Sequence, residues 1–404
     1  MTESNDIGQN ATAADEGDEA FDIISFKTVD EIEKSIVESP FRAIYQTNNF
    51  LLPQLKDIID EDRTVNLRPE YQRRSRWTNK QKSLLIESFL FNIPVPPIFL
   101  FESELARYEV MDGQQRLLAI KEFLGNQFKL SSLTVLSPLN GRNYSQLPTR
   151  TKRTLERASL SAIVLLRESR SSLRETSTKR ILELRKFVFE RLNTGGKPLN
   201  AQEIRNAVFS GPFNELVVNL AKDALFTTIW GIPPYLDDYD DEDNYESPER
   251  KANTLYRTMG DCQIVLRFFA LRNEKAISGS MRSILDGCME GNLTADKDTI
   301  SKYRSDYRSR LQLAFDLFDG QPFRLFKDDG ERPSISMYDA VMVALDRLWD
   351  KREALLHKKA PIQSMYWNSL NSTEKIESFT GRANTSSDVK NRIDAMTRII
   401  SSAL

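Results

Sequence analysis

The feature that most constrains the fold lies at residues 108–124, where a short strand gives way at once to a helix. Val110 stands in a run of strand-forming residues, and Gly113 permits a backbone conformation that a larger residue resists. Apolar residues then recur at helical spacing, at Leu117, Ile120 and Leu124. This pattern predicts a strand-to-helix turn, with the helix beginning near Gln114.

The first turn of such a helix is suited to holding an anion, because its N–H groups are unpaired and lie at the positive end of the helix dipole. Four polar side chains stand at the junction: Asp112, Gln114, Gln115 and Arg116. One interpretation is a phosphate-binding turn. The other is an ordinary connection between strand and helix with a solvated arginine, and a short motif alone does not separate the two.

The bulk properties of the chain predict a cytoplasmic protein of two domains. Its 404 residues exceed what most single cores contain. A net charge of −2 gives no overall attraction for nucleic acid, so such a contact needs a local basic patch. Two cysteines do not make a disulfide framework, and we find neither a signal peptide nor an apolar run of about 18 residues that could span a membrane.

Histidine is the scarcest of the residues that carry chemistry, because His357 is the only one in the chain. Zinc sites built from several histidines, nucleases with paired histidine ligands and reactions that need two imidazoles are therefore excluded. His357 lies at the predicted end of a helix, where we expect it to cap the helix or to be solvated.

The predicted fold class is α+β, followed by a mainly helical region. Residues 1–20 are polar and acidic and are expected to form a disordered tail. The α+β domain is predicted over residues 21–170 and the helical region over residues 171–404, with an internal boundary near residues 237–250. The acidic run 237–243 is expected to be an exposed loop rather than a metal site, because it lacks the ligand spacing of an EF-hand.

Apolar spacing also predicts the individual elements. Strands are expected at residues 21–26, 64–67, 98–101, 108–111 and 163–166. Helices are expected at residues 50–59, 79–91, 181–192, 201–209, 213–225, 262–271, 301–318, 338–356 and 389–403. Thr78 is expected to start the second of these helices, and Asn200 to cap the fourth.

A second candidate segment, residues 68–76, carries four arginines. Guanidinium groups bind phosphate oxygens in a bidentate manner, and Gln72 is suited to contact a base or ribose edge. A basic loop paired with acidic surface explains the arginines equally well. If nucleic acid is bound, a positive strip is expected to join this segment to Lys179, Arg180, Arg185 and Lys186.

Residues 189–206 form the third candidate segment, a glycine-containing loop between two predicted helices. Gly195 and Gly196 end the first helix, and the loop offers polar side chains and free backbone donors. It is not a Walker A loop, because Arg191 stands where a glycine is needed and Pro198 replaces the hydroxyl residue. A simple helical hairpin accounts for the glycines as well as a ligand site does.

Taken in order, these segments resemble the GmrSD N-terminal domain family. The resemblance spans roughly residues 45–230 and rests on several motifs that occur in the family's order. They are Tyr71-Gln72-Arg73, Trp77, residues 93–98, Asp112-Gly113-Gln114-Gln115-Arg116 and residues 189–206. For the first half of the chain this similarity implies a core like that of ParB and sulfiredoxin proteins, in which a strand-to-helix turn holds nucleotide phosphates.

In this family the motif is associated with binding and hydrolysis of nucleoside triphosphates. By that resemblance Asp112 and Arg116 form the essential pair, with Gln115 also in the catalytic set. Arg116 would neutralise charge on the phosphates, and Asp112 would position Mg²⁺ or water, or fix the loop. The implied nucleotide-binding set is Gln72, Arg73, Gly113, Gln114, Asn193 and Thr194, and DNA contact is expected at Arg74 and Arg76.

The leading hypothesis is a Mg²⁺-dependent nucleoside triphosphatase of a prokaryotic DNA restriction, anti-phage or DNA-processing system. The alternative is a nucleotide-sensing protein that binds DNA or a partner without turnover. Nicking of nucleic acid ranks last, since few carboxylates besides Glu109 lie near Asp112. Many family members continue into a histidine-dependent nuclease domain, and the single histidine here predicts that this domain is absent and that the chain does not cut DNA by that route. Either the chain acts with a separate nuclease subunit, or its helical second half recognises another molecule and the nucleotide site regulates that recognition.

Overall fold

The computed structural model describes residues 31–34, 45–59, 64–67, 77–166, 178–192, 199–235, 247–325, 333–370, 379–380 and 385–404. The chain divides into two compact units, Met1–Arg42 and Ala43–Leu404. The sheet and its surrounding helices belong to the second unit. The strand expected at residues 21–26 and the acidic run at residues 237–243 lie outside the described residues.

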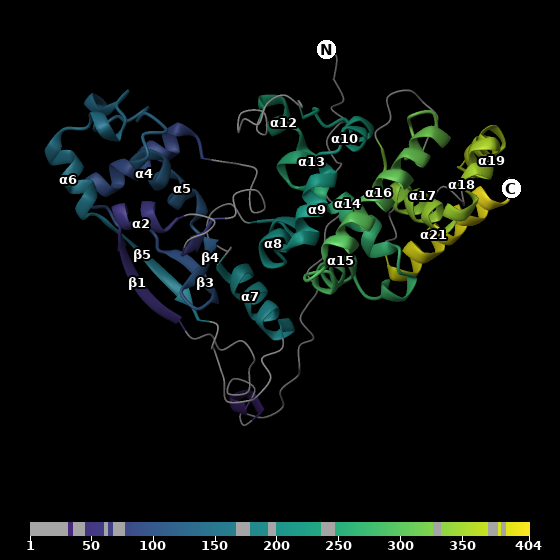
Figure 1. Ribbon diagram of the computed structural model, residues 1–404, viewed down its shortest axis with the longest axis horizontal. Coiled ribbons are helices and arrows are strands. Elements are labelled where there is room, and N and C mark those ends of the chain that lie inside the picture. Colours follow the sequence, from purple (N-terminus) through teal and green to yellow (C-terminus); the bar gives the residue numbers. More distant parts are fainter. Residues whose placement is uncertain are drawn as a thin grey trace, which may run out of the picture. The chain divides into compact units, whose positions relative to one another are not determined.

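A five-stranded mixed sheet lies at the centre of the α+β part (Figure 1). Its strands are β1 (Tyr45–Leu51), β2 (Val65–Asn66), β3 (Ile98–Glu104), β4 (Arg107–Asp112) and β5 (Ser159–Leu165). Their order is β1-β5-β3-β4-β2, in which β3 runs parallel to β5 and antiparallel to β4. The strands expected at residues 64–67, 98–101, 108–111 and 163–166 are confirmed.

The edge strand β1 is not predicted from the sequence, and its last two residues fall within the range 50–59 that is expected to be helical. Only the later part of that range is helical, as α2 (Leu52–Ile58). β1 pairs with β5, and most of its side chains are exposed. Residues 46–49 are all polar, so they lack the alternation of apolar and polar side chains from which a strand is predicted.

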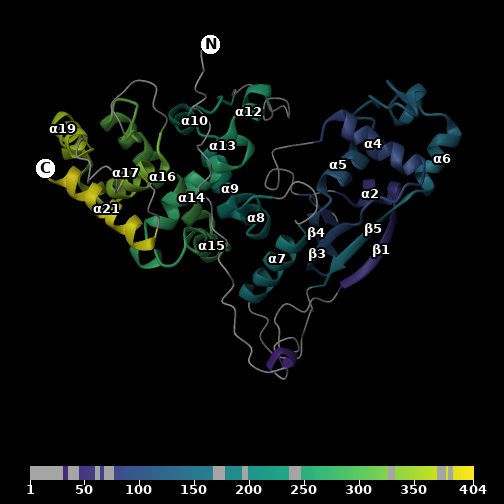
Figure 2. The same cartoon turned by 180° about the vertical axis from the view of Figure 1, so that it is seen from behind.

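Four helices cover one face of the sheet, as both views show (Figures 1 and 2). They are α2, α4 (Asn79–Leu90), α5 (Gln114–Leu124) and α6 (Thr149–Arg157). Their apolar side chains form one hydrophobic core with Ile98, Leu100 and Val110 of the sheet. Leu117 and Ile120 of α5 are fully buried in this core, which confirms the helical spacing expected for the segment.

The start of α4 follows the expected capping. Thr78 Oγ1 accepts a hydrogen bond from the backbone N–H of Gln81 at 3.3 Å, and the Gln81 carboxamide accepts one from the backbone N–H of Thr78 at 3.0 Å. This reciprocal capping box satisfies two N–H groups that the chain would otherwise leave unpaired at the helix start. It also fixes the point at which the chain leaves Trp77 and enters the helix.

The opposite face of the sheet belongs to a second hydrophobic core. Side chains alternate between the two faces of a strand, so Phe101, Met111 and Leu165 turn away from the first core. These three residues join a cluster that continues through the helices of the second half of the chain. The first helix of that half, α7 (Thr178–Leu192), contacts β4.

A buried ion pair joins β4 to α7. Glu109 shares the strand face of Met111, and its carboxylate pairs with the guanidinium of Arg185 in α7. Arg185 Nη2 also donates to the carbonyl oxygen of Ala207 in α8 (Ala201–Val208) at 2.9 Å. The same guanidinium lies 5.4 Å from the ring centre of Phe101. Arg185, a residue of α7, therefore contacts both the sheet and α8.

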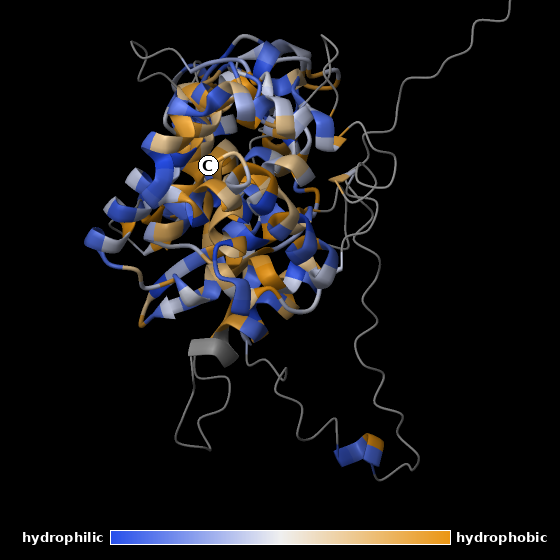
Figure 3. Cartoon of the chain, turned by 90° about the vertical axis from the view of Figure 1, so that its right-hand side faces the viewer, coloured by the Kyte–Doolittle hydropathy of each residue, from blue (hydrophilic) through white to orange (hydrophobic). Residues whose placement is uncertain are grey.

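The second half of the chain is mainly helical, as expected. Its longer helices are α9 (Pro212–Ala221), α14 (Gly260–Leu271), α15 (Met281–Gly291), α16 (Lys297–Leu317), α17 (Ile335–Arg347), α19 (Lys359–Leu370) and α21 (Ser386–Ser401). Shorter helices are α10 (Ala224–Trp230), α12 (Pro248–Ala252), α13 (Thr254–Arg257) and α18 (Arg352–His357). Figure 3 shows hydrophobic residues between these helices and hydrophilic residues mainly at their periphery. The α+β class with a helical second half is confirmed.

Two further observations concern the helices: how deeply α17 is buried, and whether any helix could cross a membrane. α17 is buried along nearly its whole length and forms the centre of the helical core. In the parts of the chain that the structure describes, no helix is both long and apolar enough to cross a bilayer.

The helix expected at residues 213–225 is two helices. α9 ends at Ala221, and α10 starts after Asp223. The Asp223 carboxylate accepts a hydrogen bond from the backbone N–H of Leu225 at 3.0 Å and so caps the second helix. Apolar spacing continues across this break, which is why the sequence predicts one helix.

The helix expected at residues 338–356 is also interrupted. α17 ends at Arg347, and Trp349 lies with its ring centre 3.9 Å from the guanidinium of Arg310. α18 then ends at His357, which is exposed at the helix C-terminus as expected. Helices α6, α15 and α19 occur where no helix is predicted, because each buries few apolar residues.

Replacing Arg185 by methionine is expected to lower the free energy of unfolding by about 3 kcal/mol, because it leaves the buried Glu109 carboxylate without its charge partner. Urea unfolding followed by circular dichroism measures the change. The control Arg107→Met removes a surface pair with Glu104, in which both side chains are mostly exposed, and should cost less than about 1 kcal/mol. Equal losses in the two variants would contradict the role given to the buried pair.

Candidate functional site

The turn between β4 and α5 has the form predicted from the sequence. β4 ends at Asp112, α5 begins at Gln114, and Gly113 between them adopts a left-handed conformation with a φ of 93°. A Cβ atom at Gly113 would overlap Cγ2 of Ile98 and would lie 3.3 Å from Arg116 Nη2. Both the backbone angle and the close packing therefore favour glycine at this position.

Asp112 and Arg116 form an ion pair across the first turn of α5. Arg116 Nη2 donates to Oδ2 of Asp112 at 2.5 Å. Arg116 Nη1 donates to the carbonyl oxygens of Pro96 and Pro97, the latter at 3.1 Å. The side chain of Asp112 is 53% exposed and that of Arg116 only 12% exposed. An accessible carboxylate thus stands beside a guanidinium that the backbone holds in place.

The N-terminus of α5 has no side-chain cap from its N-cap residue, because that residue is Gly113. Most N-cap residues supply an oxygen to the N–H groups of the first helical turn. Gly113 supplies no such oxygen, and the helix dipole at this end favours an acceptor with negative charge.

The two glutamines of the motif make contacts that differ from the ligand contacts expected of them. Gln114 is 6% exposed and donates through Nε2 to the carbonyl oxygen of Leu67 at 3.0 Å. Gln115 accepts through Oε1 from the backbone N–H of Trp77 at 3.0 Å. Leu67 and Trp77 flank residues 68–76, so the glutamines hold both ends of the arginine-rich segment at the first turn of α5.

The other predicted ligand residues lie outside the described part of the chain. They are Gln72, Arg73, Arg74, Arg76, Asn193 and Thr194. The first four belong to the segment whose two ends are anchored at the turn. The last two follow α7, which ends at Leu192, and precede α8.

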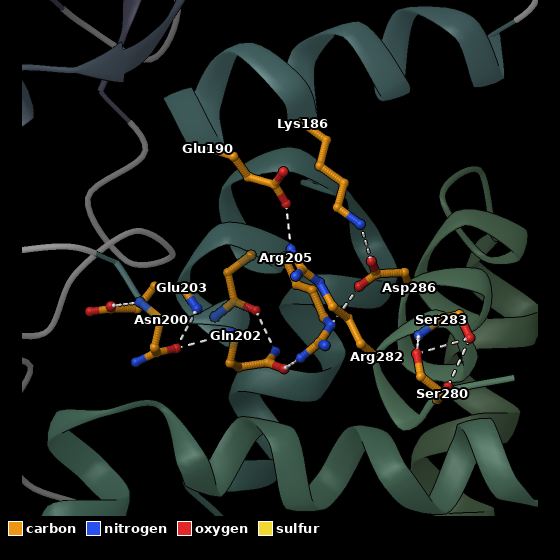
Figure 4. A network of polar contacts seen from close by, with 11 residues as sticks. Lys186, Glu190, Asn200, Gln202, Glu203, Arg205, Ser280, Arg282, Ser283 and Asp286 are labelled. Carbon is orange, nitrogen blue, oxygen red and sulfur yellow. Dashed lines mark hydrogen bonds and ion pairs between the residues drawn. The ribbon is translucent and has the colours of Figure 1, made fainter. Parts of the chain in front are cut away.

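In the described residues 199–206 of the third candidate segment, polar side chains make hydrogen bonds and ion pairs within the protein (Figure 4). Asn200 caps α8 as expected and accepts from two backbone N–H groups of its first turn, at 2.9 and 3.0 Å. Arg205 is 2% exposed and pairs through Nε with Asp286 of α15 at 2.6 Å. Lys186 of α7 binds the other oxygen of that carboxylate. These residues fasten α8 to α7 and α15.

The positive strip expected along α7 is wrong for two of its four members. Arg185 is buried in its ion pair with β4, and Lys186 is paired with Asp286. The side chains of Lys179 and Arg180 lie outside the described residues. The sequence shows the cations of α7, whereas the carboxylates that neutralise them come from distant elements.

Burial affects the ionisable side chains Cys288 and Tyr108, which lie outside the turn. Burial raises the pKa of the Cys288 thiol to about 12, and Cys262 is fully buried. Burial also raises the pKa of the Tyr108 phenol, and the neighbouring Glu102 carboxylate raises it further. In the described ranges no group of three or more His, Cys, Asp or Glu side chains is arranged to hold a metal ion.

The sequence analysis does not identify the role of the prolines before β3. The carbonyl oxygens of Pro96 and Pro97 accept from Arg116 and fix its guanidinium. The only signal for this in the sequence is that residues 93–98 are among the motifs that carry the family resemblance.

These observations define an α+β domain with a strand-to-helix turn that presents an aspartate–arginine pair. Residues 55–210 match the family model described as GmrSD restriction endonuclease, N-terminal domain, so this part of the chain is similar to that family. The family expected from the motifs is thereby confirmed, and a domain of this kind implies a component of a restriction or anti-phage system. No curated protein and no solved structure matches the chain.

Gly113→Ala is expected to destabilise the protein by about 2 kcal/mol or more, because the left-handed backbone alone costs about 1–2 kcal/mol and the added Cβ also meets Ile98. Gly141→Ala is the matched control: its φ is 81°, and no atom lies within 4 Å of an added Cβ. This control should show only the backbone cost of about 1 kcal/mol in urea unfolding. If both variants lose the same stability, the contact with Ile98 has no importance.

Proposed function

We propose that this chain binds a nucleoside triphosphate at the turn between β4 and α5 and hydrolyses it with Mg²⁺, as part of a restriction or anti-phage system. The observation that carries the proposal is the exposed Asp112 carboxylate beside the fixed Arg116 guanidinium, at a helix N-terminus that Gly113 leaves uncapped. The match to the GmrSD N-terminal domain supports the biological setting.

The phosphate chain would bind at the first-turn N–H groups of α5, where the helix dipole favours negative charge. Arg116 is held by Pro96 and Pro97 before any ligand arrives. Its contacts with these two prolines and with Asp112 use Nη1 and Nη2, so in this proposal its Nε–H would donate to a phosphate oxygen. A cation fixed in advance stabilises developing charge without having to rearrange during the reaction.

Asp112 is the residue of this turn that fits a magnesium ion. Proteins usually hold Mg²⁺ with one or two carboxylates, while substrate phosphates and water complete its coordination. The exposed carboxylate of Asp112, next to the proposed phosphate position, supplies such a ligand. When bound, the ion offsets the negative charge of the phosphates.

The glutamines have separate roles in this proposal. Gln114 positions the chain at Leu67 through its buried amide. Gln115 positions Trp77 through Oε1, while its Nε2 has no partner in the described part of the chain and can donate to a nucleotide. Further nucleotide contacts are proposed beyond the described residues, at Gln72, Arg73, Asn193 and Thr194.

A nucleotide sensor without turnover is the second candidate. It is favoured by the fact that Asp112 is already paired with Arg116 and that Glu109 is paired with Arg185. The described part of the turn therefore offers no free carboxylate as a general base for water. Nucleotide binding would then alter the affinity for DNA or for a separate nuclease subunit.

The test is phosphate release from ATP, GTP, CTP and UTP by the purified full chain, with nucleotide binding measured by calorimetry. Asp112→Ala and Arg116→Ala are expected to lower the rate of hydrolysis by about 100-fold or more, and removal of Mg²⁺ by a chelator to abolish it. Arg142→Ala is the matched control, because its guanidinium also donates to two carbonyl groups, those of Pro138 and Gln146. It should leave the rate unchanged.

Each outcome separates the two candidates. Turnover that is lost in both site variants and kept in the control supports the triphosphatase. Nucleotide binding without phosphate release supports the sensor. If the folded wild-type protein binds none of the four nucleotides, both candidates are wrong.

A further inference from the structure

Residues 125–157 carry a local positive charge that the proposed nucleotide site does not use. The whole chain has a net charge of −2, whereas this segment has Glu156 as its only acidic residue. Its basic residues are Lys129, Arg142, Arg150, Lys152, Arg153 and Arg157. Most of the excess positive charge therefore lies on α6.

Three arginines form a row on the solvent face of α6. Arg150, Arg153 and Arg157 are separated by three and four residues, so they share one face of the helix. Leu155, the buried residue of α6, lies on the opposite face and packs into the first hydrophobic core. All three arginines are exposed, and none of them forms an ion pair with another described residue.

The other charged side chains of α6 have partners inside the domain. Lys152 Nζ donates to the carbonyl oxygen of Ser145 at 2.6 Å and lies 5.8 Å from the ring centre of Tyr144. The Glu156 carboxylate accepts from the Tyr144 hydroxyl at 3.0 Å. The helix thus uses one lysine and its single glutamate for its own packing and leaves three guanidinium groups in water.

We infer that the arginine row of α6, which consists of Arg150, Arg153 and Arg157, binds the phosphate backbone of duplex DNA. Guanidinium groups match phosphate oxygens in a bidentate manner. At a rise of about 1.5 Å per residue the row extends about 10 Å, and the phosphates of one DNA strand repeat about every 3.4 Å of duplex axis. The row is therefore long enough to contact more than one phosphate.

The composition of α6 argues against other occupants of this face. A helix that lies on a membrane inserts apolar side chains into it. The apolar Leu155 of α6 is already buried in the core of the protein. A protein interface needs an apolar centre, which the arginine row also lacks. A polyanionic backbone requires neither. The inference rests on the proposed function only for the choice of DNA as that polyanion.

Binding of the full chain to a short unmodified DNA duplex, measured by fluorescence anisotropy over a range of salt concentrations, tests the inference. The triple variant Arg150→Gln, Arg153→Gln, Arg157→Gln is expected to reduce the slope of log affinity against log salt by about 2.7, since each lost phosphate contact removes about 0.9. The control triple variant removes the same charge from exposed residues of α16: Lys297→Gln, Lys302→Gln and Arg304→Gln. It should keep the wild-type slope.

Replacing the three arginines of the row by lysine should retain most of the slope, because lysine still contacts phosphate as a point charge. Equal slopes for the glutamine variant and the control variant overturn the inference. So does a wild-type protein that binds no duplex at low salt, or one that binds an RNA duplex or anionic lipid vesicles more tightly than DNA. Phosphate release by the wild-type protein is measured without DNA, so its absence counts against the proposed function alone.

Discussion

The buried ion pair between Glu109 and Arg185 is the interaction on which the rest of the arrangement depends. β4 sends Val110 into one hydrophobic core and Met111 into the other, so the strand is packed from both sides. The ion pair adds a directional contact on the second side. Such a pair gains little net free energy after desolvation, but it determines how α7 lies on the sheet. Because Asp112 ends the same strand, the position of its carboxylate depends on that packing.

The motif residues divide into those that fix structure and those that meet solvent. Arg116 donates to the carbonyl oxygens of Pro96 and Pro97, and Gln114 donates to that of Leu67. Arg205, near the end of the third candidate segment, is buried. Asp112 is the exposed member of the set. A binding site of defined geometry needs supporting residues that lock the contacting ones in place. The turn is built in this way, so a ligand meets a surface that is already formed.

Local sequence patterns predict much of this fold. The features that these patterns do not predict depend on contacts between residues far apart in the sequence. The turn at Gly113 and the cap at Thr78 depend on residues within a few positions of each other, and both are found as predicted. The edge strand β1 depends on pairing with β5, and the neutralisation of Arg185 depends on a strand far away in the sequence. In the candidate site Asp112 and Arg116 lie only four residues apart, at the end of β4 and in the first turn of α5, whereas the contribution of the proline carbonyls required the folded chain.

The hydrogen bonds of Gln114 and Gln115 fix the ends of residues 68–76 independently of what lies between them. Closing a chain between two fixed ends costs free energy that rises slowly with length, by about 0.6 kcal/mol for each doubling. A longer connection between Leu67 and Trp77 should therefore add little to the closure cost. The two anchored residues, Leu67 and Trp77, can thus be joined by connections of different length while the turn between β4 and α5 stays unchanged.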